Sequence, residues 1–253
     1  MSEDTRGVDW SDHRAVLFDL DGVLTPTAEV HMRAWSEMFN DFLRGYADGD
    51  GDGDASPYTD ADYFAHVDGK PRYDGVRDFL TARGIELPEG SDDDAPDRLT
   101  VRGLGNRKND AFNEVLERDG VAAYPGSRTL LDHLRELGLP LAVVSSSANA
   151  PAVLEAAEIA DRFDAVVDGR VAKDTGLQGK PAPDTFLHAA AALDVRADEA
   201  VVLEDAVSGV RAGVAGGFGL VVGVDRGAGD ALREAGATLV ISDLAELVPG
   251  GAR

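Results

Sequence analysis

Six short apolar runs alternate along the chain with longer stretches of helical spacing. The runs cover residues 15–18, 139–144, 163–167, 201–203, 220–222 and 238–241. Residues 127–137, 151–159 and 184–193 lie between them and place apolar side chains on one helical face, as Leu130, Leu131 and Leu134 do. Strands that are apolar throughout are buried on both faces of a parallel sheet. The alternation therefore predicts an α/β fold with a doubly wound parallel-sheet core.

The first apolar run is separated from the second by residues 19–138, far more than one crossover helix requires. Most of this interval has helical spacing, with Val30, Ala34, Met38 and Phe42 on one face and a further apolar group near Phe79. We therefore expect three parts: a flexible amino-terminal tail (1–12), a core domain built from two segments (13–27 and 121–248), and an inserted helical cap domain (28–120).

The charge of the chain excludes several classes of partner. It carries 33 Asp and 14 Glu against 20 Arg and 4 Lys, a formal net charge of −23. Such a field repels nucleic acid and anionic membrane surfaces. The absence of cysteine excludes disulfides, a thiolate zinc site and a cysteine nucleophile. With no apolar leader and no apolar run long enough to span a bilayer, we expect a soluble, cytoplasmic monomer.

Two acidic stretches interrupt the predicted cap, at residues 48–54 (DGDGDGD) and 89–97 (EGSDDDAPD). Asp48, Asp50 and Asp52 match the opening of a calcium-binding EF-hand loop, but the twelfth position is Thr59 instead of the bidentate Glu that this geometry needs. The composition favours solvated loops in both places, with a cation site in the first as the alternative.

Polar side chains follow several of the predicted strands at the point where each strand ends. Asp19 and Asp21 follow the first run, and the serines at 145–147 follow the second. Lys180 precedes a predicted helix, and Glu204 and Asp205 end the run that begins at residue 201. Ligands of open α/β sheets bind at the carboxyl ends of the strands, so we expect these side chains to meet.

Each of these features alone has an ordinary structural explanation, as a turn, a cap or a surface charge. Together they form a chemical set, because several carboxylates on one rim repel one another unless a cation joins them. An all-oxygen ligand set suits Mg²⁺, while serine and lysine side chains hold phosphoryl oxygens. The set predicts a Mg²⁺-dependent phosphoryl-transfer site.

Four segments, LFDLDGVLT, the serine after the second run, GKPAPD and LEDAVSGVRAG, resemble in order the four motifs of the haloacid dehalogenase superfamily. The resemblance extends from about His13 to Asp243. The segments TAEVHMRAW, RKND and YPG are similar to the β-phosphoglucomutase branch of that superfamily, which implies a Rossmann-like core with a helical cap.

The resemblance also implies a role for each matching residue. Asp19 is the nucleophile that forms an aspartyl-phosphate, and Asp21 is the general acid and base. Ser145, Ser146 and Lys180 bind the transferring phosphoryl group. The metal ligands are Asp19, Asp21 through its backbone carbonyl, Glu204 and Asp205. The remaining substrate-binding residues are Thr27, His31, Trp35, Arg72, Lys108, Ser147 and Asn149.

Two positions depart from that branch. Its members tend to carry a lysine directly before the asparagine that matches Asn149, where this chain has Ala148, and Pro26 stiffens the predicted hinge. The pair Lys70 and Arg72 offers basic groups for a distal phosphate, with a solvated pair on a turn as the alternative.

The first functional hypothesis is therefore a β-phosphoglucomutase-type enzyme that interconverts hexose 1-phosphate and 6-phosphate, with a hexose bisphosphate as activator. Closure of the cap would let the bisphosphate reorient while water is excluded. The alternative is a phosphatase that hydrolyses a small phosphosugar, and a non-catalytic acidic metal-binding module is the third. The chain lacks both the G-x-G-x-x-G dinucleotide fingerprint and the Gly-Lys-Ser/Thr phosphate loop. The surplus of aspartate is typical of a halophilic protein, with biased genome composition as the alternative.

Overall fold

The computed structural model describes residues 8–47 and 53–250. The chain divides into two compact units, Met1–Thr27 with Val121–Arg253, and Ala28–Gly120. We refer to the first as the core unit and to the second as the cap unit.

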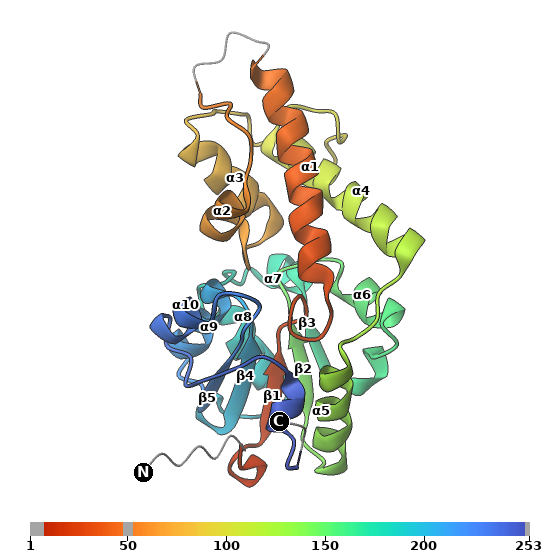
Figure 1. The fold of residues 1–253 in the computed structure, drawn as a ribbon, viewed down its shortest axis with the longest axis vertical. Coiled ribbons are helices and arrows are strands. Elements are labelled where there is room, and N and C mark those ends of the chain that lie inside the picture. Colours follow the sequence, from red (N-terminus) through yellow and green to blue (C-terminus); the bar gives the residue numbers. More distant parts are fainter. Residues whose placement is uncertain (1–7, 48–52, 251–253) are drawn as a thin grey trace. The chain divides into compact units, whose positions relative to one another are not determined.

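The core unit is built on a sheet of six parallel strands, of which β1 to β5 are labelled in Figure 1. The strands are β1 (Ala15–Phe18), β2 (Leu141–Val144), β3 (Ala165–Val167), β4 (Ala200–Glu204), β5 (Leu220–Val224) and β6 (Leu239–Ile241). Their order, β3-β2-β1-β4-β5-β6, places β1 between β2 and β4. The prediction of a doubly wound parallel sheet is confirmed, since each predicted apolar run overlaps one strand.

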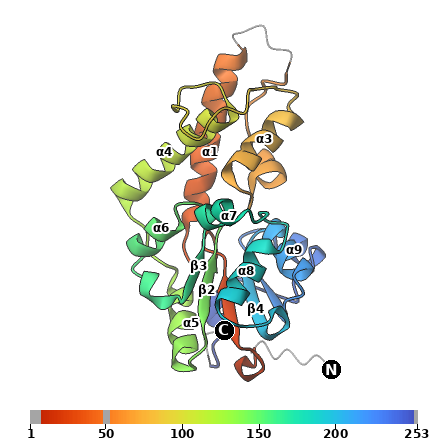
Figure 2. The same cartoon turned by 180° about the vertical axis from the view of Figure 1, so that it is seen from behind.

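Helices cover both faces of this sheet. They are α5 (Pro125–Glu136), α6 (Ala150–Ala156), α7 (Gly169–Thr175), α8 (Asp184–Ala192), α9 (Val207–Ala215) and α10 (Gly229–Glu234). Helix α8 contacts β1, β2 and β3, in front of the sheet in Figure 2, and α9 contacts β4 and β5. A Cβ at Gly213 of α9 would lie 3.1 Å from Val221 and 3.3 Å from Val202, so the glycine allows the helix to lie close to the strands.

The sequence of β1 explains why it is central. Ala15 and Leu17 belong to the apolar cluster that includes Phe186 of α8, and the alternate residues Val16 and Phe18 are also fully buried. All four side chains leave water, which fits a strand covered on both faces. Phe18 pairs with Val143 of β2 and with Leu203 of β4, so the carboxyl ends of these three strands lie side by side.

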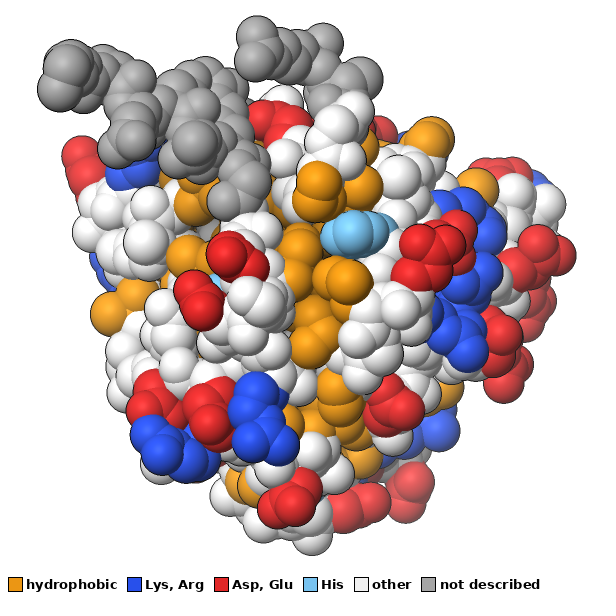
Figure 3. All heavy atoms as spheres, turned by 90° about the horizontal axis from the view of Figure 1, so that it is seen from below, with side chains coloured by type: hydrophobic (Ala, Val, Ile, Leu, Met, Phe, Trp, Pro, Cys, Tyr) orange, Lys and Arg blue, Asp and Glu red, His pale blue; other side chains and the backbone are white. Residues whose placement is uncertain are grey.

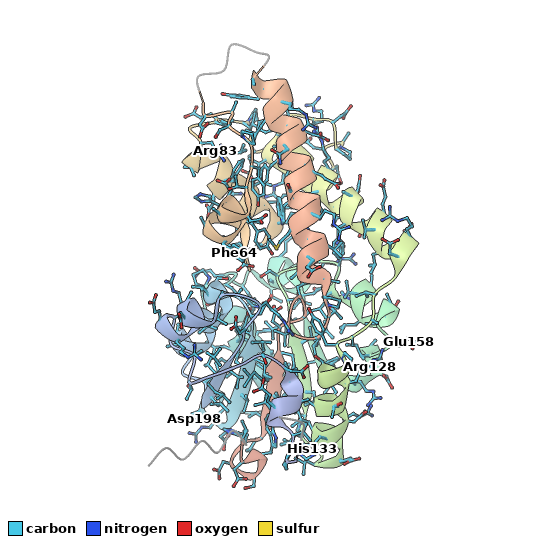
Figure 4. All side chains as sticks on the ribbon, viewed as in Figure 1. Phe64, Arg83, Arg128, His133, Glu158 and Asp198 are labelled. Atoms are coloured by element: carbon cyan, nitrogen blue, oxygen red, sulfur yellow. The ribbon has the colours of Figure 1, made fainter. Side chains whose placement is uncertain are left out.

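The cap unit is helical, as the spacing predicts. Its elements are α1 (Thr27–Ala47), α2 (Asp60–Asp62), the π-helical turn η2 (Tyr63–Val67), α3 (Arg72–Ala82) and α4 (Val101–Asp119). Phe39 of α1 lies at the centre of its apolar core, with ring centroids 5.0 Å from Tyr58 and 4.1 Å from Phe79. Arg83, labelled in Figure 4, ends α3 and forms ion pairs with Asp54 and Asp62. Among the described residues, no helix combines the length and the apolar character needed to cross a membrane.

The second acidic stretch, residues 89–97, contains no helix or strand, as expected. Its carboxylates are used locally: Glu89 and Asp92 form ion pairs with Arg102, and Asp94 accepts a hydrogen bond from Thr100. The first stretch lies largely outside the described residues, and with it the three aspartates of the calcium alternative, Asp48, Asp50 and Asp52.

The amino-terminal region differs from the expected tail over its last residues. Trp10–Asp12 form a 3₁₀ turn, η1, which is capped by the side chain of Asp9. Trp10 is buried, and its indole N–H donates to the carbonyl of Leu247 at 3.1 Å. The composition of this segment is polar overall, so the sequence did not indicate that the single large apolar side chain of Trp10 would anchor it.

Figure 3 views the molecule from below Figure 1 and shows hydrophobic side chains exposed across this face, with charged side chains around them.

Further hydrogen bonds join segments of the core unit that are distant in sequence. Figure 4 labels Arg128 of α5, whose Nη2 donates to the carbonyl of Ala157 at the end of α6 (2.6 Å). The next residue, Glu158, turns the chain with a φ of 56°. This link ties the helix that precedes β2 to the helix that follows it.

Candidate active site

The predicted site residues of the core unit gather where β1, β2 and β4 end. Asp19 follows β1, Ser145 follows β2, and Glu204 is the last residue of β4. The order of strands reverses on either side of β1, and in open α/β sheets ligands bind in the crevice at such a reversal. The sheet topology thus brings together residues that lie more than a hundred positions apart in sequence.

Lys180 joins the ends of these strands. Its Nζ lies 2.5 Å from Oδ1 of Asp19, 2.6 Å from Oε1 of Glu204 and 3.0 Å from the carbonyl of Val144. The exposed fractions of Lys180, Asp19 and Glu204 are 3%, 7% and 1%. Lysine and glutamate are almost never buried to this extent unless they are paired. The ion pair therefore fixes the ends of β1, β2 and β4 relative to one another.

Burial raises the pKa of Asp19 well above its ordinary value, because a charged carboxylate loses its hydration there. The ammonium of Lys180 opposes this rise, whereas Glu204 and Asp21 add to it by repulsion. Burial also disfavours the charged form of Lys180, but Asp19 and Glu204 outweigh that effect and place the pKa of Lys180 above its ordinary value. One ammonium thus faces an excess of negative charge, which favours the binding of a further cation.

Glu204 is held at both of its carboxylate oxygens. Oε1 accepts from Lys180, and Oε2 accepts the backbone N–H of Ala206 at 2.9 Å. A Cβ at Gly209 of α9 would lie 1.7 Å from Oε1 of Glu204. The glycine is required here because any side chain would occupy the place of the carboxylate.

The carboxylates of Asp19, Glu204 and Asp205 offer oxygen atoms that all lie within 4.8 Å of one another. Oxygen donors of this kind suit Mg²⁺, and the buried excess of negative charge gives a cation a reason to bind. Gly22 has a φ of +80°, and a Cβ there would lie 1.8 Å from Oδ2 of Asp205, so the turn after β1 passes directly against this carboxylate. These residues fit a magnesium ion.

The side chain of Asp21 is turned to other partners. Its Oδ1 accepts from the hydroxyl of Thr27, and its Oδ2 lies 3.5 Å from the hydroxyl of Ser145. Thr27 is in turn 2.8 Å from the hydroxyl of Thr25, which is fully buried. A carboxylate that is oriented by hydroxyls and does not belong to the acidic cluster is placed for proton transfer.

The serine loop after β2 is compact and lies close to α7. The backbone N–H of Ser147 donates to the hydroxyl of Ser145 (3.1 Å), and the N–H of Asn149 donates to the hydroxyl of Ser147 (3.2 Å). Ser146 is half-buried, and a Cβ at Gly169 would lie 2.8 Å from its carbonyl oxygen. Ser145, Ser147 and Asn149 are therefore joined in one hydrogen-bonded loop beside Asp21, which also contains Ser146. Lys180, the third predicted phosphate-binding residue, contacts the carbonyl of Val144 just before this loop.

Three of the predicted cap residues meet within the cap unit. The Nζ of Lys108 on α4 contacts Nδ1 of His31 on α1 and lies 5.1 Å from the ring of Trp35. Phe112, one turn further along α4, stacks on His31 with ring centroids 4.1 Å apart. Lys108 is buried. An ammonium and an imidazole are thus held together against aromatic rings.

Arg72, the first residue of α3, lies against the face of α4 that carries Lys108. A Cβ at Gly105, three residues before Lys108, would lie 3.5 Å from Cγ of Arg72. The guanidinium of Arg72 lies over the ring of Tyr73 at 4.8 Å and donates to its hydroxyl at 3.0 Å. Lys70, which the sequence pairs with Arg72, instead forms an ion pair with Asp78 at 2.7 Å. The two bases therefore have different partners, and their binding of a distal phosphate stays a prediction.

Sequence reasoning did not identify Phe112, Tyr73 or Thr25 as parts of the site. Phe112 follows Lys108 at helical spacing, so the spacing i, i+4 could have predicted that it lies beside Lys108. Tyr73 and Thr25 act through contacts that only the tertiary structure creates.

With the geometry established, the chain can be compared with known proteins. Residues 13–217 match the family model described as haloacid dehalogenase-like hydrolase. This match covers most of the chain, and the chain belongs to the haloacid dehalogenase-like hydrolase family. The fold and the four motifs place it among the enzymes of that family.

Individual relatives define the branch. The chain is 50% identical over 240 residues to the β-phosphoglucomutase of Mycobacterium tuberculosis (strain CDC 1551 / Oshkosh), covering 93% of this chain and 91% of the relative. It is 28% identical to a phosphorylated carbohydrates phosphatase of Thermotoga maritima, covering 90% and 93%. The crystal structure of a β-phosphoglucomutase from Clostridium difficile has the same fold, with a TM-score of 0.73, 24% identity and 93% of each chain covered. The predicted β-phosphoglucomutase-like branch is confirmed.

Replacement of Lys180 tests the buried ion pair. In Lys180→Met, we expect the free energy of unfolding at about pH 8 to fall by about 3 to 5 kcal/mol, because Asp19 and Glu204 lose their cation. The raised pKa of Asp19 means that the folded state binds more protons than the unfolded state above the ordinary carboxyl range. Stability of the variant therefore decreases as the pH rises above the ordinary carboxyl range. Urea unfolding in metal-free buffer measures both effects. Lys173→Met, at an exposed position of α7, is the control, and a Lys180→Met protein as stable as the wild type at pH 8 would contradict the argument.

Replacement of Gly22 tests the contact with Asp205. Gly138 has a similar φ of +73° but no atom within 4 Å of its Cβ position, so Gly138→Ala is a matched control. We expect both alanine variants to lose about 1–2 kcal/mol of stability through backbone strain. Only Gly22→Ala should also weaken Mg²⁺ binding, by about tenfold or more, because Asp205 must move. Calorimetric titration with Mg²⁺ decides the question, and equal affinities in the two variants would show that the contact is irrelevant to the metal.

Proposed function

We propose that this protein is a Mg²⁺-dependent phosphosugar mutase of the β-phosphoglucomutase type, which interconverts hexose 1-phosphate and 6-phosphate through an aspartyl-phosphate. The observation that carries the proposal is the buried carboxylate of Asp19, held by Lys180 at the reversal point of the sheet beside Glu204 and Asp205. The 50% identity to a relative named β-phosphoglucomutase supports the same reaction.

Asp19 is the nucleophile. One of its carboxylate oxygens forms a bond to phosphorus while the bond between phosphorus and the sugar oxygen breaks. Lys180 holds Oδ1 of Asp19 and brings positive charge to the phosphoryl oxygens. Bound by Asp19, the backbone carbonyl of Asp21, Glu204 and Asp205, Mg²⁺ would supply further positive charge against the phosphoryl group.

Asp21 is the general acid and base. In the first half-reaction its carboxyl gives a proton to the departing sugar oxygen, and in the second its carboxylate takes a proton from the attacking hydroxyl. Thr27 and Ser145 hold the two oxygens of Asp21 in separate directions, which orients the carboxyl for this exchange. Ser145 and Ser146 then bind the phosphoryl oxygens, and Ser147 and Asn149 extend the polar loop towards the substrate.

The cap unit provides substrate-binding side chains. Lys108 and His31 form a basic pair against Trp35, suited to a sugar hydroxyl and its neighbouring charge. Arg72 is a half-buried residue whose guanidinium lies over Tyr73, and a guanidinium is well suited to bind a second phosphate. A hexose bisphosphate is the activator that such a reaction requires, because it phosphorylates Asp19 at the start.

A phosphatase acting on a small phosphosugar is the second candidate. Two observations favour it: the similarity to the phosphatase of Thermotoga maritima and the presence of Ala148, which adds no charge to the serine loop. In this alternative water intercepts the aspartyl-phosphate, and every role assigned to the core residues stays the same.

The proposed setting follows from the substrate and the charge of the chain. Phosphorylated sugars are metabolites of the cell interior, so we place the enzyme in the cytoplasm, acting as a monomer with a small phosphosugar. The net charge of −23 is much larger than the few carboxylates of a metal site account for. It favours a halophilic protein, in which salt screens the repulsion between surface carboxylates.

The reaction is tested by incubating the protein with Mg²⁺ and β-glucose 1-phosphate, with and without catalytic glucose 1,6-bisphosphate. Glucose 6-phosphate and free phosphate are followed. We expect isomerisation that depends on the bisphosphate, whereas rapid release of phosphate would identify the phosphatase.

The assigned nucleophile is tested in the same assay. Asp19→Asn should abolish both turnover and phosphoenzyme formation, while Asp132→Asn, at an exposed position of α5, keeps full activity. An Asp19→Asn protein with near-wild-type activity would refute the mechanism.

The acidic surface is tested by thermal melting in dilute buffer and in about 1 M KCl, where the screening length falls to about 3 Å. We expect the melting temperature to rise with salt because repulsion between surface carboxylates is screened. Equal melting temperatures in both solutions would leave biased composition as the explanation.

A further inference from the structure

The turn that follows Asp21 is held from outside at three consecutive carbonyl groups. The carbonyl of Gly22 accepts from Nε of Arg226 at 2.7 Å. The carbonyl of Val23 accepts from the hydroxyl of Ser127 at 2.9 Å, and that of Leu24 accepts from the backbone N–H of Tyr124, also at 2.9 Å. Donors from two distant parts of the sequence thus hold the backbone of one short turn.

Arg226 differs from the other two donors. Ser127 is buried within α5 and Tyr124 donates through its backbone, whereas Arg226 is an exposed residue in the loop after β5. Its guanidinium lies over the ring of Tyr124 at 4.3 Å, and its Nη1 donates to the carbonyl of Ser242 at 3.1 Å. One side chain therefore links the loops after β5 and β6, the segment before α5 and the turn after β1.

The contacts of Arg226 are with two backbone carbonyls and an aromatic ring, and it forms no ion pair with a carboxylate among the described residues. In a chain with nearly two acidic residues for each basic one, several exposed arginines have carboxylate partners, as Arg118 and Arg196 do. A guanidinium directed instead at the carbonyl of Gly22 favours a role in fixing that peptide.

The contact with Arg226 matters because Gly22 lies between two site residues. Gly22 follows Asp21 directly, has a φ of +80°, and passes against Asp205. Glycine has the widest backbone freedom of all residues, so the turn relies on external contacts to keep one conformation. The hydrogen bond from Arg226 fixes the carbonyl side of Gly22, while its N–H is fixed by the carbonyl of Thr25 at 2.8 Å.

We propose that Arg226 is a positioning residue for the phosphoryl-transfer reaction: by holding the carbonyl of Gly22, it keeps the carboxyl group of Asp21 where it can protonate the leaving oxygen. The proposal rests on the function proposed above. Arg226 acts through the backbone of the turn and is assigned no contact with the substrate.

The choice of phosphoryl donor separates positioning from a general loss of structure. When a sugar phosphate phosphorylates Asp19, the bond between phosphorus and the sugar oxygen breaks and the oxygen needs the proton of Asp21. When acetyl phosphate is the donor, acetate leaves as a stable anion and needs no proton. A displaced Asp21 therefore slows the first reaction and spares the second.

The experiment compares Arg226→Gln, Arg226→Lys and the control Arg233→Gln, an exposed arginine of α10 whose recorded ion pair is with Asp230 in the same helix. Phosphoenzyme formation is measured with acetyl phosphate, and turnover with β-glucose 1-phosphate and glucose 1,6-bisphosphate. We expect Arg226→Gln to lower the kcat for the sugar phosphate about tenfold to a hundredfold, with little change in phosphorylation by acetyl phosphate. Arg226→Lys, which keeps a charged donor, should recover most of the loss, and Arg233→Gln should match the wild type.

Each other result overturns the proposal. An equal loss of rate with both donors would mean that Arg226 maintains the fold or the metal site in general. A wild-type kcat in Arg226→Gln would mean that the turn after β1 keeps its conformation without Arg226. A lysine variant as slow as the glutamine variant would exclude positioning through a donated hydrogen bond. Failure of the proposed function is distinct: the wild-type protein then forms no phosphoenzyme with either donor, and the role of Arg226 fails with it.

Discussion

The ammonium of Lys180 lies buried between two carboxylates that belong to different strands. Removing such groups from water costs several kcal/mol for each charge, and only close pairing with well-placed partners offsets the cost. Asp19, Glu204 and the carbonyl of Val144 provide those partners at 2.5, 2.6 and 3.0 Å. Each contact comes from the end of a different strand. The pairing is therefore satisfied only when β1, β2 and β4 end at the same level, and the register of the sheet supplies that condition.

The same cluster explains two glycines that the fold alone would not require. Gly209 lies in the first turn of α9, where glycine is a weaker helix former than alanine, yet a Cβ there would overlap the carboxylate of Glu204. Gly22 lies where the turn approaches Asp205. In both places the backbone gives up stability or rigidity so that a carboxylate can lie against it. Rigidity lost at Gly22 must be restored by neighbouring segments, which is the part played by the donors from Arg226, Ser127 and Tyr124.

Much of this arrangement could be predicted from the sequence, because it depends on local pattern and on topology. Apolar runs predict the six strands, and the rule that ligands bind at the carboxyl ends of parallel strands brings Asp19, Ser145 and Glu204 together. The hydrogen-bond partners of the two carboxylate oxygens of Asp21 could not be predicted, because the two-residue period of a strand tells only on which face its side chain lies. Its partners Thr27 and Ser145 depend on how the turn leaves the strand. The partner of Lys70 could not be predicted for a similar reason: Asp78, with which it forms an ion pair, lies on α3, eight positions further along the chain.

Burial of lysine is the clearest case of a functional feature that a sequence does not display. The chain has only four lysines, and two of them, Lys108 and Lys180, are buried. Lysine is the residue least suited to burial, because its ammonium is strongly hydrated and its stem is long. An acidic protein that keeps so few lysines uses arginine for its surface ion pairs, as in those of Arg77, Arg118 and Arg196. In the proposed function, its buried lysines do what a compact, desolvated ammonium does well, which is to hold an anionic oxygen where water is excluded.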